Sequence, residues 1–262
     1  MGSVVTETEA TYKLMSGPPR YVANTPWRPV SAIAVTFLVF AGQIIGILAA
    51  IAFINVGPDW LRTSLALGDS MSSPGALLMM MISQIASIAL VWAFAGYKGA
   101  RTSTLQLSKP PRRWATYLEG GLLTIAATGL VEIIFYKGLG YDLMSDARDL
   151  AEGMRSPYWP AAMIMAVVLA PLWEELTFRG FLLSALAQSR LGFWGAALVT
   201  NTAWTLLHWS YSPAGLATVF TAGMMLTWLI WRTGSIRAPI AAHAIANLFA
   251  SGFAYWLGGG LG

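Results

Sequence analysis

The chain has 262 residues, of which 56% are hydrophobic and only 11% are charged, and its formal net charge is +4. Soluble domains carry about 25% charged residues, so this composition excludes an ordinary water-soluble enzyme and indicates a protein that crosses a membrane several times. The chain has no cysteine, which excludes disulfides, thiolate metal sites and a cysteine nucleophile. Because the basic residues gather in one loop and at helix ends, we expect the lipid bilayer, and no nucleic acid, as a partner.

Residues 1–29 are polar and contain prolines, without the apolar core of a signal peptide, and we expect them to form a flexible polar segment. Residues 30–257 are expected to form one all-α polytopic transmembrane helical bundle of about seven spans, within a range of six to eight. Residues 258–262 are a glycine-rich tail.

The first two spans are expected at about 30–56 and 74–97, and the loop 98–113 that follows holds five basic residues and no acidic one. By the positive-inside rule this loop is cytoplasmic, and the N-terminus lies on the same side. After a third span at about 114–136, the mixed-charge loop 137–157 is expected to hold a short surface helix on the outer side.

Four more spans follow, at about 158–190, 191–208, 214–232 and 238–257. The boundary near residue 208 comes from the turn-forming sequence Trp209–Pro213, which divides an uncharged stretch that is too long for one span. Counting residues along these helices places His208 roughly 10 Å farther from the cytoplasmic side than Glu174 and His243. A helix offset or tilt must close that gap if the three act together.

The fourth span contains Glu174, Glu175 and Arg179 inside an apolar run. A charge at bilayer depth costs roughly 2.5–3.5 kcal/mol on insertion scales, so such a cluster needs partners and usually marks function. Glu175 and Arg179 have the i, i+4 spacing of a favourable helical ion pair, and we predict a structural pair there. Glu174 points about 100° away on a helix and is predicted to act as a general base. The alternative is a salt-bridge cluster that only holds helices together.

The chain contains two histidines, His208 and His243, and both fall inside predicted spans. Asn247 lies four residues after His243 and therefore on the same helical face. Glu174 as base, His208 to orient its water, and His243 with Asn247 as donors to an oxyanion form a set suited to water attack on an amide carbonyl. These four are the predicted catalytic residues.

Three motifs in this order resemble the CPBP family of intramembrane proteases, which includes the type II CAAX prenyl endopeptidases and bacterial bacteriocin-processing and immunity proteins. They are Glu-Glu-x-x-x-Arg-Gly at 174–180, Trp-x-x-x-His at 204–208 and His-x-x-x-Asn at 243–247, and the CPBP-like core extends over about 161–250. Trp204 departs from the family pattern, in which this aromatic residue is most often Phe, and we expect the change to be tolerated.

The resemblance implies an endopeptidase of the bacterial cytoplasmic (inner) membrane that cleaves a membrane-associated peptide or protein with water activated by Glu174. The alternatives are a non-catalytic scaffold or immunity-type partner protein and, with less support, a small transporter. No cofactor is expected, because the His-Glu-x-x-His pattern of many zinc hydrolases is absent. If zinc is bound, its expected ligands are Glu174, His208 and His243.

Overall fold

The structure, a computed structural model, describes residues 12–59, 71–142 and 145–258. Within these residues it is all-helical, and six helices are long and apolar enough to cross a membrane. They are α1 (Pro29–Asn55), α3 (Pro74–Ala95), α5 with the π-helical turn η2 (Arg113–Ile133 and Ile134–Gly138), a composite helix over 159–186, α11 (Pro213–Thr233) and α12 (Arg237–Gly258). This confirms the predicted polytopic helical bundle.

The shorter helices are η1 (Tyr97–Gly99), α4 (Arg101–Thr104), α6 (Arg148–Arg155) and α10 (Gly192–Leu206). Helix α6 is the short helix expected in the loop between the third and fourth spans. Helix α10 occupies the place of the predicted fifth span, but its 15 residues are too few for the roughly 20 that a membrane crossing needs. The count of long apolar helices is therefore six, at the lower limit of the predicted range.

Local sequence signals set the two ends of α11, the helix that follows α10 and packs against it. Helix α11 begins after Ser212, whose hydroxyl accepts a hydrogen bond from the Gly215 amide, and Pro213 fills the first helical position. It ends at Gly234, which has the left-handed φ of 62° and donates its amide hydrogen to Ile230. The turn before α11 thus reverses the chain, and α10 and α11 pack against each other.

The composite helix, hereafter the central helix, consists of α7 (Trp159–Ile164), η3 (Met165–Leu169), α8 (Ala170–Glu174), η4 (Glu175–Leu182) and α9 (Leu183–Leu186). The segments η3 and η4 are π-helical, a rare geometry that occurs frequently at functional sites. All residues from Trp173 to Leu186 are buried, so this helix supplies much of the protein core.

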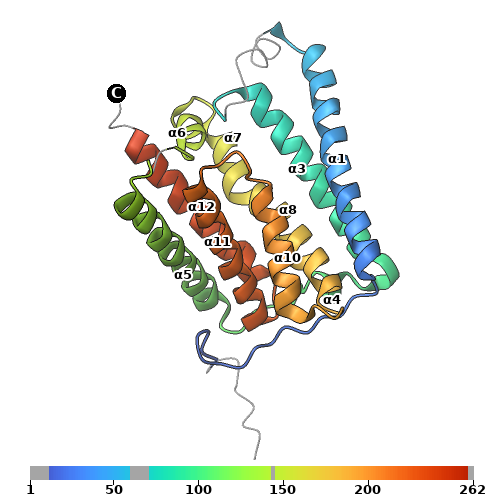
Figure 1. The fold of residues 1–262 in the computed structure, drawn as a ribbon. Coiled ribbons are helices and arrows are strands. Elements are labelled where there is room, and N and C mark those ends of the chain that lie inside the picture. The colour runs from blue at the N-terminus through green and yellow to red at the C-terminus, as the bar shows by residue number, and fades with distance from the viewer. Residues whose placement is uncertain (1–11, 60–70, 143–144, 259–262) are drawn as a thin grey trace, which may run out of the picture.

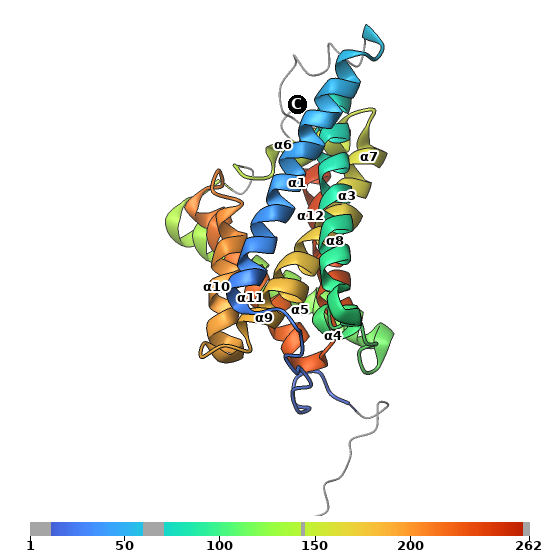
Figure 2. The same ribbon diagram turned by 90° about the vertical axis from the view of Figure 1, so that its right-hand side faces the viewer.

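The central helix lies between two groups of helices (Figures 1 and 2). Helices α1 and α3 pack together on one side, while α5 packs against α11 and α12 on the other. The central helix contacts α1, α3, α10 and α12. Its charged residues are therefore enclosed by other helices instead of facing lipid.

Of the N-terminal segment predicted to be flexible over 1–29, the described residues 12–28 cross the end of the bundle (Figure 1). The Tyr12 hydroxyl donates to the Arg232 carbonyl at 2.7 Å, and Arg232 Nε donates to the Leu14 carbonyl at 2.7 Å. Tyr12 and Leu14 are both buried. The buried Tyr12 and Leu14 side chains and these hydrogen bonds attach the polar segment to the end of α11. Residues 1–11 and most of the glycine-rich tail, 259–262, lie outside the described residues.

Candidate active site

Glu175 and Arg179 form the predicted ion pair in the fully buried interior. Arg179 Nη1 lies 3.1 Å from Glu175 Oε1, and neither side chain is exposed. The other guanidinium nitrogens reach α10 and α11: Nη2 donates to Asn201 Oδ1 at 3.2 Å, and Nε lies 3.5 Å from Thr227 Oγ1. Each nitrogen of the buried guanidinium therefore faces an acceptor, as a cation removed from water requires.

Gly223 makes room for this arrangement on α11. A Cβ at this position would overlap Asn201 Oδ1 and would lie 2.6 Å from Arg179 Nη2. Asn201 is held from its other end, because its Nδ2 donates to the Phe220 carbonyl at 2.9 Å. The absence of a side chain at 223 thus lets α10, α11 and the central helix meet at Arg179.

His243 lies between the two glutamates. Its Nδ1 is 3.0 Å from Glu175 Oε1, and its Nε2 is 4.0 Å from Glu174 Oε2. An ionised carboxylate only accepts hydrogen bonds, so we assign the imidazole hydrogen to Nδ1. Glu175 is thus shared by Arg179 and His243, whereas the sequence analysis assigned it to Arg179 alone. In neutral His243, Nε2 is an acceptor that faces Glu174.

Glu174 has a hydrogen-bond partner that the sequence analysis missed. The indole Nε1 of Trp204 donates to Glu174 Oε2 at 2.7 Å, and Trp204 itself is buried. The guanidinium of Arg179 lies over the same indole, with its carbon 4.2 Å from the ring centroid, within cation–π range. The departure from Phe at this position was the available signal, since an indole has an N–H donor and a phenyl ring has none.

Exposure separates the four charged or polar groups into two pairs. The side chains of Glu174 and His243 are 11% and 9% exposed, whereas those of Glu175 and Arg179 are fully buried. A small molecule can therefore reach Glu174 and His243 only.

His208 packs against Trp204, the residue that donates to Glu174. Its ring centroid is 5.3 Å from that of Trp204, and its Nδ1 is 3.3 Å from the Trp204 carbonyl. Among the described residues there is no hydrogen bond between His208 and Glu174. Trp204, one turn before His208 on α10, reaches Glu174 through its long side chain.

Asn247 faces the central helix, as its helical register predicted. Its Nδ2 donates to the Ala166 carbonyl at 2.8 Å. Pro171 has no amide hydrogen to offer to the carbonyls of the preceding turn, where residues 166 and 167 lie. The side-chain amide of Asn247 supplies the missing donor to the Ala166 carbonyl in that turn. One of its two N–H groups is thus used within the fold, and the second remains for another acceptor.

Tyr211 borders the same site next to His208, with ring centroids 5.2 Å apart. Desolvation by the surrounding chain, followed by the charges of Glu174, Asp146 and Asp149, raises the pKa of the Tyr211 phenol. Asp146 accepts hydrogen bonds from the amide and hydroxyl of Ser212, at 2.8 and 2.6 Å. The loop before α6 is thereby tied to the turn between α10 and α11, beside the site.

The expected zinc ligands do not gather around one point. The part of the chain that the structure describes contains no group of three or more His, Asp or Glu placed to hold a metal ion. His243 uses Nδ1 on Glu175, and Glu174 Oε2 accepts from Trp204, while the His208 ring packs against that indole. In this arrangement Glu174 and His243 therefore hydrogen-bond to protein groups.

The site falls inside the segment that a comparison with protein families identifies. Residues 156–249, which are 94 of the 262, match the family described as type II CAAX prenyl endopeptidase Rce1-like. Comparison with curated proteins and with solved structures gave no match. Together with the six apolar helices, the family match identifies an integral membrane protein. The matched segment contains all three motifs, and this match supports the resemblance to the CPBP family of intramembrane proteases.

Proposed function

We propose that this protein is an intramembrane endopeptidase that hydrolyses a peptide bond of a membrane-associated peptide or protein, with Glu174 as the base. The observation that carries the proposal is the 4.0 Å separation between Glu174 Oε2 and His243 Nε2, the two reachable atoms of the cluster. Two acceptors at that separation leave space for one water beside them that hydrogen-bonds to both at about 2.8 Å. Such a water is held by the groups that can take its proton.

The proposed reaction needs no covalent enzyme intermediate. As the water oxygen attacks the substrate carbonyl carbon, its proton passes to Glu174, and the carbonyl oxygen becomes an oxyanion. The free N–H of Asn247 donates to this oxyanion, and His208 polarises the carbonyl from the side of Trp204. When the C–N bond breaks, the amine leaves with the proton that Glu174 took. The products are a carboxylic acid and an amine.

His243 supports this sequence in both of its protonation states. Neutral, it accepts a hydrogen bond from the water through Nε2; protonated, it donates from that atom to the oxyanion. Glu175 holds the Nδ1 hydrogen at 3.0 Å and stabilises the imidazolium, the role that a buried carboxylate has beside a catalytic histidine. Glu175 and Arg179 are therefore positioning residues, because no substrate reaches them.

We propose further that the enzyme is independent of metal and lies in the bacterial inner membrane with its N-terminal segment on the cytoplasmic side. The N-terminal segment, the basic loop after α3 and the turn before α12 support this orientation, because they lie together at one end of the bundle. Gln106 of the basic loop donates to the Val22 carbonyl, and the Ile236 amide donates to the Gln106 carbonyl. The positive-inside rule places such an end in the cytoplasm. Activity that persists in a chelator would agree with the absence of a metal.

The test compares membranes that contain the wild type, Glu174→Gln or Glu132→Gln. The Glu174 variant keeps the size of the side chain but loses the base, and we expect it to insert and fold while peptide fragments seen with the wild type disappear. Glu132, in the third span, is a matched control and should leave the fragments unchanged. Full proteolysis by Glu174→Gln would overturn the proposal. A scaffold protein would yield no wild-type fragments, and a transporter would keep its transport when Asn247 is changed.

A further inference from the structure

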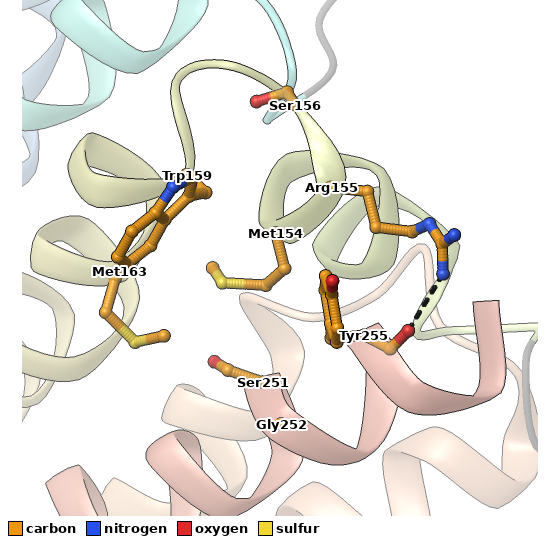
Figure 3. Close-up of a pocket in the computed structure, with 8 residues that line it drawn as sticks. All are labelled: Met154, Arg155, Ser156, Trp159, Met163, Ser251, Gly252 and Tyr255. Carbon is orange, nitrogen blue, oxygen red and sulfur yellow. Dashed lines mark hydrogen bonds between the residues drawn. The ribbon is translucent and has the colours of Figure 1, made fainter. Parts of the chain in front are cut away.

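A cavity of about 430 Å³ opens between α6, α7 and α12, apart from the catalytic cluster (Figure 3). Its walls are mostly apolar. Helix α7 contributes one side and α12 the other, while the Met154 side chain of α6 points between them. The principal lining residues are Met154, Trp159, Met163, Ser251 and Tyr255, with Arg155 at the edge.

Ser251 is the unusual member of this lining. It is 1% exposed, and its hydroxyl has no hydrogen-bond partner among the described residues. A helical serine in an apolar setting commonly donates to the carbonyl four residues earlier, which Ser251 does not do. Figure 3 shows its oxygen directed into the space between Met163 and Met154. A buried polar atom of this kind needs an explanation, and a ligand that brings a hydrogen-bonding group provides one.

The cavity lies along the same face of α12 as the proposed catalytic residues His243 and Asn247. On α12, Ser251 lies one turn beyond Asn247 and two turns beyond His243, on the same face. On the opposite, antiparallel wall, Met163 comes one turn before Ala166, the residue whose carbonyl binds Asn247. Eight helical residues span about 12 Å, a distance that an extended peptide covers in about four residues. A substrate bound at Glu174 and His243 can therefore reach the cavity.

We propose that this cavity is a specificity subsite that binds a large apolar side chain of the peptide substrate, two to four residues from the bond that is cut, while the Ser251 hydroxyl hydrogen-bonds to the peptide backbone. This inference rests on the function proposed above. Two methionines suit such a subsite, because their flexible thioethers adapt to side chains of different shape. A peptide also brings donors and acceptors to the depth of Ser251, which the hydrocarbon part of a lipid lacks.

The subsite predicts that residue preference changes in opposite directions when the cavity is filled or enlarged. Ser251→Trp fills it, and the residue at one fixed position near the cut should change from large (Leu, Phe, Met) to small (Ala, Gly). Met163→Ala enlarges it and should favour aromatic residues there. The measurement is sequencing of the new peptide termini in membranes of each variant, and the expected change in preference is about tenfold or more. Leu248→Trp, on an exposed part of α12 outside the cavity, is the matched control.

A binding measurement independent of cleavage uses the absence of cysteine from the chain. Ser251→Cys in the Glu174→Gln background provides a single thiol in the cavity, which benzyl methanethiosulfonate should label. A peptide that spans an identified cleavage site should slow this labelling, while the same peptide with alanine at the selected position should not.

The two proposals fail in different ways. If Glu174→Gln removes the fragments but both cavity variants keep the wild-type residue preference, the subsite is wrong and the endopeptidase stands. Equal protection of the thiol by both peptides, or protection by added phospholipid alone, would also overturn the subsite. Fragments that persist with Glu174→Gln would overturn the function itself.

Discussion

The indole Nε1 of Trp204 lies 2.7 Å from Oε2 of Glu174, so a residue of α10 fixes the carboxylate that we propose as the base. The same ring packs against the Arg179 guanidinium on its face, and the rings of His208 and His243 approach it in edge-on contacts. Trp204 thus contacts every side chain that we propose as catalytic except Asn247. The fold positions Glu174 through this one indole.

Trp204→Phe should therefore separate positioning from packing. The phenyl ring keeps most of the apolar contact, so the protein should fold, but Glu174 loses a hydrogen bond to a charged group, which contributes about 1.5–3 kcal/mol. We expect kcat to fall about 10- to 100-fold with little change in KM. Steady-state kinetics on an identified peptide would measure this, with the exposed Trp256→Phe as control. An unchanged kcat would show that the hydrogen bond has no role in catalysis.

Gly223→Ala should destabilise the protein, because the added methyl overlaps Asn201 Oδ1 and crowds Arg179 Nη2. Overpacking of this kind costs about 1–3 kcal/mol, and here it also disturbs the acceptors of a buried cation. The thermal unfolding midpoint of the solubilised protein should fall. Gly129→Ala is the matched control, since a Cβ there meets nothing within 4 Å and alanine favours the helix. Equal midpoints for the two variants would contradict this account.

Asn247 has two proposed roles, to hold α12 against the central helix and to stabilise the oxyanion. A second substitution, at Pro171, can separate them. Asn247→Ala removes the donor to the Ala166 carbonyl and should lower both stability, by about 1 kcal/mol, and kcat, by about 100-fold or more. Adding Pro171→Ala restores a backbone amide hydrogen in that turn. We expect the double variant to regain thermal stability but not kcat. Recovery of both would show that Asn247 only holds the two helices together.

The attachment of the N-terminal segment should depend on pH through Tyr21. Burial raises the pKa of this phenol to about 12, an effect that its hydrogen bond to Ser184 partly offsets. Since the folded pKa lies above the unfolded value near 10, the neutral phenol stabilises the fold below pH 10, and this contribution is lost as the pH rises toward 12. Unfolding midpoints measured from pH 8 to 11 should fall less for Tyr21→Phe than for the wild type. The exposed Tyr136→Phe should behave like the wild type.

The sequence by itself determined the features that depend on local pattern. Apolar runs and basic loops identified the helical bundle, and the i, i+4 spacing identified the Glu175–Arg179 pair, because neighbours on one helix turn meet in any fold. The register of α12 likewise placed His243 and Asn247 on one face. Three ordered motifs were sufficient for the family resemblance, which the match over residues 156–249 supports.

Only the tertiary structure decided which groups meet across helices. It gave Glu175 a second partner in His243, gave Glu174 the indole of Trp204, and directed Asn247 to the Ala166 carbonyl. It also made α10 a short helix and bound residues 12–28 to the end of the bundle. These contacts depend on helix offset, rotation and π-helical geometry. No periodicity in one segment encodes such quantities, because they are set when several helices pack around the same buried charges.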